Sequence, residues 1–217
     1  MSFKFGVTGG LGAGKNTVVS ILEEFAREDG IPFHAYDLDE IAKNQYVSPT
    51  SPAYPTVIDA IGIQILRSDM HVDTRVLGRI VFEQPTQLTK LEEILRPRIQ
   101  DYLLPFFELP GMHCVNAALL LEKDLLSFVD KRVLLVTIKD KVRRERLRIR
   151  NPELSDDDIS KRLKAQMTDN EKCKRLYPLE NQGRRSYIVS NNGQLETLRN
   201  ALNLVWSALK VDYEMPR

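Results

Sequence analysis

The segment GGLGAGKNT, residues 9 to 17, carries the residues whose chemistry is easiest to name. It fits the pattern G-x-x-x-x-G-K, in which backbone N–H groups, a helix N-terminus and a lysine ammonium surround phosphate oxygens. A strand-like stretch precedes it, and apolar residues at helical spacing follow, so the context disfavours a chance glycine-rich turn. We therefore predict that nucleotide phosphates bind to Gly9, Gly10, Leu11, Gly12, Ala13, Gly14, Lys15, Asn16 and Thr17.

Asn16 stands where such loops carry Ser or Thr, whose hydroxyl coordinates Mg²⁺. An amide oxygen is still an acceptable Mg²⁺ ligand, although it lies one bond further from the backbone. Thr17 keeps a hydroxyl next to it. We predict that phosphate binding is retained and that Asn16 alters metal coordination, with Mg²⁺ held mainly through water and the nucleotide.

Asp37 and Asp39 follow the second predicted strand, at residues 31–36. Ligands of open parallel sheets gather at the carboxyl ends of the strands. Either carboxylate could accept a proton from an attacking hydroxyl or hold Mg²⁺ through water. Helix N-capping is the alternative, because a helical segment follows and Asp is a favoured cap. The two residues could divide these roles.

The most basic segment is residues 141–150. On a helix, Arg143, Arg146 and Arg150 share one face. Arginines placed in this way could close over ATP phosphates and stabilise a transferring phosphoryl group. A solvated basic face is the alternative. When the arginine cluster is considered without its sequence context, this alternative is slightly favoured.

Five strand candidates alternate with helical segments, which indicates parallel βαβ units with right-handed crossovers. The strands are expected at residues 3–7, 31–36, 113–121, 132–138 and 187–189, with helices from Lys15 and over 194–209. A charged helical hairpin is expected at 139–177, its second helix opening with the capping pair Ser155 and Asp158. We predict one domain: an α/β core (1–46, 108–138 and 178–217), a helical substrate-binding insertion (about 47–107) and a lid (about 139–177).

Composition excludes several classes of partner. The formal net charge is +1, so the overall charge of the chain does not indicate binding to nucleic acid or to an anionic membrane. No apolar run approaches the roughly 18 residues of a membrane span, and the N-terminus lacks the apolar core of a signal peptide. Cys114 and Cys173 are too few for a disulfide framework or a metal knuckle. We expect a soluble cytoplasmic protein.

Together these motifs resemble dephospho-coenzyme A kinase, from Phe5 to about Leu202. The glycine-rich loop looks like the opening of that family, and residues 37–42 are similar to its Asp-Ala-Asp-x-Ile-Ala segment. Residues 73–82 are close to its most distinctive stretch, and residues 119–122 to its Leu-Leu-Phe-Glu. Arg146, Arg150, Arg162 and Gln166 fall on its lid pattern, and residues 191–193 on its base-contacting loop.

The resemblance implies a P-loop kinase fold with a five-stranded parallel sheet, a coenzyme-A-binding insertion and a lid. It implies phosphorylation of the 3′-hydroxyl of dephospho-CoA with ATP and Mg²⁺, by a monomer or weak homo-oligomer. Asp39 is the first choice for activating the hydroxyl, and Asp37 the second. ATP would be held by the loop with Lys15, Arg146, Arg150 and Asn191, and dephospho-CoA by Asp39, Arg75, Arg79, Leu120, Glu122, Arg162 and Gln166.

Departures from the family pattern bear on activity rather than on fold. Asn16 replaces Ser, Arg96 replaces His before Pro97, Asn116 and Ala118 replace Asp and Pro, and Ser186 replaces an acidic residue. Two other functions therefore stay open. A different small-molecule P-loop kinase, for a nucleoside monophosphate or a sugar acid, shares the core but not the stretch 73–82. A non-catalytic nucleotide or CoA sensor would explain the departures without chemistry.

Overall fold

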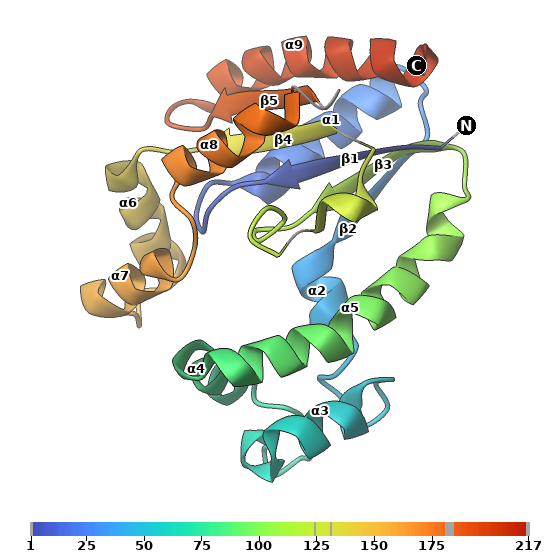
Figure 1. Cartoon of the computed structure of the whole chain (residues 1–217). Helices are drawn as coiled ribbons and strands as arrows, with labels where there is room; N and C mark the ends of the chain where they lie inside the picture. Colours follow the sequence, from blue (N-terminus) through green and yellow to red (C-terminus); the bar gives the residue numbers. More distant parts are fainter. Residues whose placement is uncertain (1, 124, 131, 181–184, 216–217) are drawn as a thin grey trace. The chain divides into compact units, whose positions relative to one another are not determined.

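The structure is a computed structural model that describes residues 2–123, 125–130, 132–180 and 185–215. It divides into two compact units (Figure 1). The first contains Met1–Tyr36 and Leu109–Arg217, and the second contains Asp37–Glu108.

The first unit is built on a five-stranded sheet in the order β2-β3-β1-β4-β5. The strands are β1 (Ser2–Thr8), β2 (Phe33–Asp37), β3 (Gly111–Asn116), β4 (Arg132–Thr137) and β5 (Arg185–Ser190). Strand β1 pairs in parallel with β3 and β4, and β4 pairs in parallel with β5. The predicted parallel α/β sheet is thus confirmed.

Strand β3 differs from the predicted strand 113–121. It begins at Gly111 and ends at Asn116, and the chain then turns. Leu120 and Leu121 are nevertheless fully buried. The apolar run predicts a longer strand because a buried turn and a buried strand give the same short apolar pattern in a sequence.

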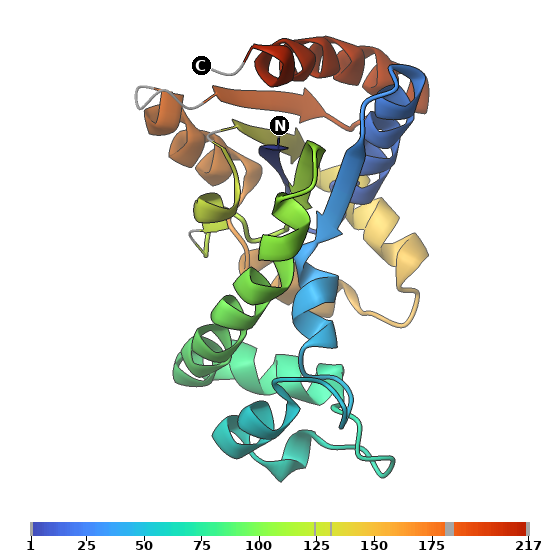
Figure 2. The same ribbon diagram turned by 90° about the vertical axis from the view of Figure 1, so that its right-hand side faces the viewer.

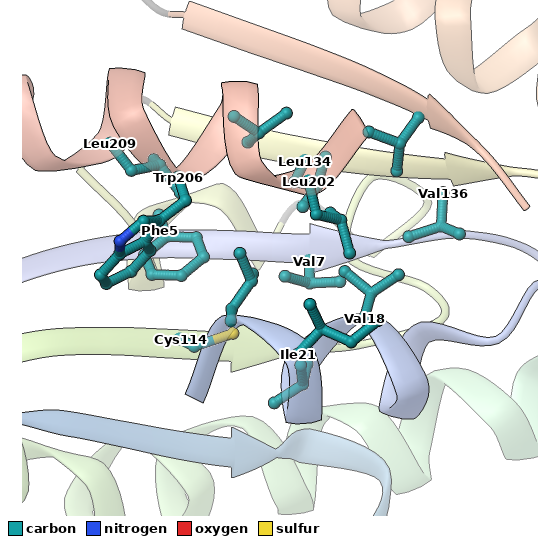
Figure 3. Packing of buried hydrophobic residues seen from close by; sticks show 14 of the residues in the cluster. Phe5, Val7, Val18, Ile21, Cys114, Leu134, Val136, Leu202, Trp206 and Leu209 are labelled. Carbon is teal, nitrogen blue, oxygen red and sulfur yellow. The ribbon is translucent and has the colours of Figure 1, made fainter. Parts of the chain in front are cut away.

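The core of the first unit lies between the sheet and the helices α1 (Lys15–Glu28) and α9 (Leu195–Glu214). Figure 3 shows Val18 and Ile21 of α1 facing Val7 of β1, and Leu202 and Trp206 of α9 packed in the same cluster. Each fully buried large apolar side chain stabilises the fold by about 1.5–3 kcal/mol. This packing fixes the end of β1 and the start of α1, between which the glycine-rich loop runs.

The segment expected to be a helical hairpin contains three helices: α6 (Asp140–Arg150), α7 (Asp156–Lys164) and α8 (Asp169–Glu180). The predicted cap of the second is confirmed, because Ser155 Oγ accepts from Asp158 N and the Asp158 carboxylate accepts from Ser155 N. A second capping box, at Thr168 and Glu171, begins α8. That Thr-x-x-Glu pattern was a readable signal for the missed helix.

One buried carboxylate ties the edge of the sheet to α9. Asp212 is 5% exposed and accepts hydrogen bonds from Arg132 Nε at 2.9 Å and Arg185 Nη1 at 2.7 Å, with Tyr187 Oη at 3.4 Å. Burial by itself raises the pKa of Asp212, but Arg132 and then Arg185 more than offset it, so the pKa lies below its usual value. A depressed pKa stabilises the fold above the unfolded-state value of about 3.9, and this contribution is lost as the pH falls through the folded-state pKa.

We therefore expect Asp212→Asn to lower the free energy of unfolding by about 3 kcal/mol at pH 7, because two guanidinium groups lose their charged partner. The difference from wild type should shrink as the pH falls below about 4. Urea denaturation at pH 7 and pH 3.5 measures both effects. Asp157→Asn is the control, since its ion pair with Lys161 is 72% exposed on both sides and should contribute under about 1 kcal/mol. Equal losses of unfolding free energy in the two variants would contradict the conclusion that the buried Asp212 ion pairs stabilise the fold.

The second unit consists mainly of helices, of which α5 is the long green one in Figures 1 and 2. They are α2 (Leu38–Asn44), α3 (Tyr54–Ile61), α4 (Thr74–Glu83) and α5 (Pro85–Phe107), with a 3₁₀ turn at Ile63–Ile65. A small core holds them together, formed by Tyr54, Val57, Ile65, Leu77, Leu91, Leu95 and Leu103. The unit begins at Asp37, earlier than residue 47, where the insertion was expected to start. Across the described residues, no helix is long and apolar enough to cross a membrane.

Candidate active site

The glycine-rich loop connects β1 to α1, as predicted. Gly12 and Gly14 have φ of 78° and 87°, a left-handed conformation that favours glycine. A Cβ at Gly10 would lie 2.3 Å from Arg143 Nη1, and one at Gly14 would lie 2.3 Å from Asn191 Nδ2. Lys15 opens α1, and its Nζ donates to Gly9 O at 3.3 Å. The glycines are thus required both by backbone conformation and by the side chains that cover the loop.

Asn16, which is predicted to alter metal coordination, makes a contact that the sequence did not indicate. Asn116 Nδ2 donates to Asn16 Oδ1 at 2.9 Å, across 100 residues of chain. Asn116 is the last residue of β3 and is 4% exposed. Its Oδ1 is buried and has no hydrogen-bond partner among the described residues. The side-chain amides of Asn16 and Asn116 are therefore one structural feature.

Arg143 is buried over the loop. It is 8% exposed, and its Nη2 donates to Asp169 Oδ1 at 2.6 Å. Asp169 Oδ2 in turn accepts from Ile138 N at 2.8 Å. The solvated-face alternative is therefore wrong for Arg143, although the prediction that it shares a helix face with Arg146 and Arg150 holds on α6. The partner Asp169 was missed because it begins a separate helix.

Arg146 and Asn191 contact each other beside the loop. Arg146 Nη2 donates to Asn191 Oδ1 at 3.2 Å, and Asn191 Nδ2 donates to Ala13 O at 2.8 Å. Asn191 is 6% exposed, and its backbone N–H donates to Thr137 O. Asn191, expected at the base of ATP, here uses both ends of its amide to join the loop to Arg146 of α6.

Arg150 and Arg162 line one pocket of about 190 Å³ next to the loop. Its other walls are Leu11, Leu147, Asn151, Leu154 and Ile159. Both arginines are exposed. From the sequence, Arg150 was assigned to ATP and Arg162 to dephospho-CoA, whereas the structure places both side chains in the same pocket. Two guanidinium groups at one opening favour an anionic ligand.

Gln166 and Glu122, both predicted to bind substrate, connect the segment 139–177 to the rest of the first unit. Gln166 Oε1 accepts from Leu11 N at 2.9 Å. Glu122 Oε1 accepts from Met167 N at 3.2 Å and from Lys172 Nζ at 2.5 Å. Lys172 is fully buried and also donates to Ala118 O at 2.8 Å. Lys172 was not among the predicted site residues, because it is one of several lysines in the segment 139–177.

Leu120, the remaining predicted substrate residue of the first unit, is fully buried. A Cβ on Gly6 would lie 2.5 Å from Leu120 Cδ2, so the side chain packs on the sheet. Its side chain is therefore part of the core of the first unit, and a contact between Leu120 and substrate stays a prediction.

The other candidates lie in the second unit. Asp37 caps α2, its Oδ1 accepting from Asp39 N at 3.0 Å and Glu40 N at 3.3 Å. The capping alternative thus holds for Asp37. Asp39 lies in the first turn of α2 and is exposed. Arg75 and Arg79 are one turn apart on α4 and are also exposed.

Comparison with known proteins identifies the family. The family model for dephospho-CoA kinase matches residues 3–195. A dephospho-CoA kinase from Bacillus cereus is 32% identical over 210 residues, covering 94% of this chain and 100% of its own length. One from Geobacillus kaustophilus is 33% identical over 218 residues, covering 97% and 100%.

Solved structures agree on the fold. A Thermus thermophilus protein superposes with a TM-score of 0.75 at 26% identity, covering 96% of this chain and 98% of its own. Dephospho-CoA kinase from Campylobacter jejuni gives a TM-score of 0.57 at 18% identity, with coverage of 96% and 98%. The latter likeness shows the fold alone. From the extent of the family match and the identity over full-length relatives, the chain belongs to the dephospho-CoA kinase family.

Proposed function

We propose that this chain transfers the γ-phosphoryl group of ATP to the 3′-hydroxyl of dephospho-CoA, giving CoA and ADP. The observation that carries the proposal is the Gly9–Lys15 loop between β1 and α1, covered by arginines of α6, in a chain that belongs to this kinase family. Phosphoryl transfer depends mainly on positioning and charge stabilisation, which such a loop and such arginines supply.

At the ATP end, the loop N–H groups and Lys15 would hold the β- and γ-phosphates. Arg146 lies beside Gly14, and Arg150 lines the pocket next to Leu11, so both can close over bound phosphates. Their closure would exclude water, which otherwise hydrolyses ATP. Arg143, already paired with Asp169, would position the loop rather than move onto the nucleotide.

Mg²⁺ fits the residues present at the loop. Hard oxygen atoms are its preferred ligands, and it readily keeps several waters. The buried Oδ1 of Asn116 lacks a partner among the described residues, so it can accept from a metal-bound water, next to Asn16. When bound, Mg²⁺ would supply positive charge that neutralises the negative charge developing on the phosphates.

At the acceptor end, Asp39, an exposed residue in the first turn of α2, would take the proton of the 3′-hydroxyl. The carboxylate of Asp37 is the N-cap of the same helix. Arg75 and Arg79 would contact the pyrophosphate or pantetheine end of dephospho-CoA from α4. Glu122 and Gln166 would hold the lid segment that closes the site.

The test is turnover by the purified chain with ATP, Mg²⁺ and dephospho-CoA, following CoA and ADP together. A nucleoside monophosphate and a sugar acid serve as competing acceptors in parallel reactions. We expect CoA formation only with dephospho-CoA. Faster phosphorylation of another acceptor would favour the general P-loop kinase alternative, and nucleotide binding without turnover would favour the sensor.

The arginines of α4 give a prediction for the acceptor. Arg75→Ala or Arg79→Ala should raise the KM for dephospho-CoA at least about tenfold, since a charge-assisted contact to an anion contributes about 1.5–3 kcal/mol. The KM for ATP should change little. Arg98→Ala, an exposed arginine on α5, is the control. Equal changes for both substrates would mean that this face of α4 is only solvated.

A further inference from the structure

The Asn16–Asn116 pair lies where the loop meets the carboxyl end of the sheet. Asn16 is the second residue of α1, and Asn116 ends β3, level with Val7 in the neighbouring strand β1. Their amides are joined by the 2.9 Å bond from Asn116 Nδ2 to Asn16 Oδ1. Because that bond uses the Asn116 nitrogen, the buried Oδ1 of Asn116 is left as an acceptor without a partner among the described residues.

The charge of this pair is unusual for a phosphate-binding loop. P-loop enzymes hold Mg²⁺ with a hydroxyl at the position after the loop lysine and with an Asp from a neighbouring strand. This chain places a neutral amide at the first position and another at the end of the adjacent strand. In the part of the chain that the structure describes, no group of three or more His, Cys, Asp or Glu side chains could hold a metal ion.

A carboxylate and an amide differ in their effect on the binding of metal-free ATP. A carboxylate beside the phosphates repels them unless a cation lies between, so nucleotide binding becomes dependent on metal. A neutral amide removes that repulsion, and it can still accept a hydrogen bond from a water of a hydrated ion.

We propose that the Asn16–Asn116 amide pair uncouples nucleotide binding from divalent metal in this chain. The site binds metal-free ATP nearly as tightly as Mg–ATP, and it contacts Mg²⁺ only through water at Asn116 Oδ1. The inference rests on the proposed function in that ATP is taken as the ligand of the loop.

Isothermal titration calorimetry with ATP, in excess EDTA and in excess MgCl₂, tests this without turnover. For the wild type we expect the two dissociation constants to agree within about threefold. Asn116→Asp should weaken binding of metal-free ATP by about tenfold or more, from one added charge at an effective dielectric constant of about 20, and should weaken Mg–ATP binding much less. Asn200→Asp, exposed on α9, is the control for added charge and should change neither constant.

A second variant keeps the test decisive if Asn116→Asp does not fold. Asn16→Asp places the carboxylate in the first turn of α1, where negative charge favours a helix, and it should also weaken metal-free binding selectively. Circular dichroism and thermal unfolding verify that each variant is folded.

The inference is overturned if the wild type binds Mg–ATP more than about threefold better than metal-free ATP, or if neither aspartate variant changes that ratio. Failure to bind either form of ATP overturns both the inference and the proposed function. Binding without phosphorylation of dephospho-CoA overturns the proposed function alone, since the ratio of the two constants still decides the inference.

Discussion

Lys15→Ala should lower kcat/KM for ATP by about 10²–10³-fold, the size of effect seen when a group that stabilises transition-state charge is removed. Lys15 opens α1, and its ammonium lies against Gly9 O, at the loop where the β- and γ-phosphates are expected. Its positive charge would stabilise the transition state of phosphoryl transfer more than the ground state. Part of the decrease in kcat/KM should therefore appear in kcat. Steady-state kinetics with saturating dephospho-CoA measures it.

The loss must be separated from damage to the fold. Lys15 is partly exposed at the first position of its helix, where alanine is well tolerated. The free energy of unfolding measured in urea should therefore change little. Lys90→Ala, an exposed lysine on α5, is the matched control and should retain wild-type kinetics. Near-wild-type turnover in Lys15→Ala would remove the loop from the proposed mechanism.

Local patterns predicted the parts of the fold that depend on neighbouring residues. The loop, the positions of the five strands and the Ser155 cap all follow from spacings of a few residues, which fix backbone conformation and burial directly. The same patterns could not separate a buried turn from a strand after Asn116. They also treated residues 139–177 as one hairpin, although Thr168 and Glu171 form a second capping box.

The contacts within the candidate site were not predictable in this way. Asn16 meets Asn116, Arg143 meets Asp169, and Lys172 meets Glu122, each across a long separation in sequence. Spacing identifies which residues share a helix face, but it does not identify the partner that a different element brings to that face. The sequence therefore indicated which residues carry charge at the site. The structure showed which charges are already paired within the first unit.

The distinction between Asp37 and Asp39 was left open by the sequence, and the structure makes it testable. Asp37 uses its carboxylate as the N-cap of α2, accepting from two backbone N–H groups. Asparagine caps a helix about as well as aspartate, so Asp37→Asn should keep both stability and most of kcat. Asp37→Ala should cost about 1 kcal/mol of stability through loss of the cap.

Asp39→Asn should instead lower kcat by about 10²–10⁴-fold, because an amide of the same size cannot accept the proton of the 3′-hydroxyl. The KM for dephospho-CoA should change less than kcat, since the amide keeps most hydrogen bonds of the ground state.

The pH dependence of kcat adds a second readout. If Asp39 is the base, the acid limb of the wild-type kcat profile should be absent from the residual activity of Asp39→Asn and present in Asp37→Asn. If Asp37→Asn shows the larger loss of kcat while α2 stays folded, the two roles are reversed. If neither variant loses activity, proton transfer from the hydroxyl does not pass through either carboxylate, and positioning by the loop and the lid arginines carries the reaction.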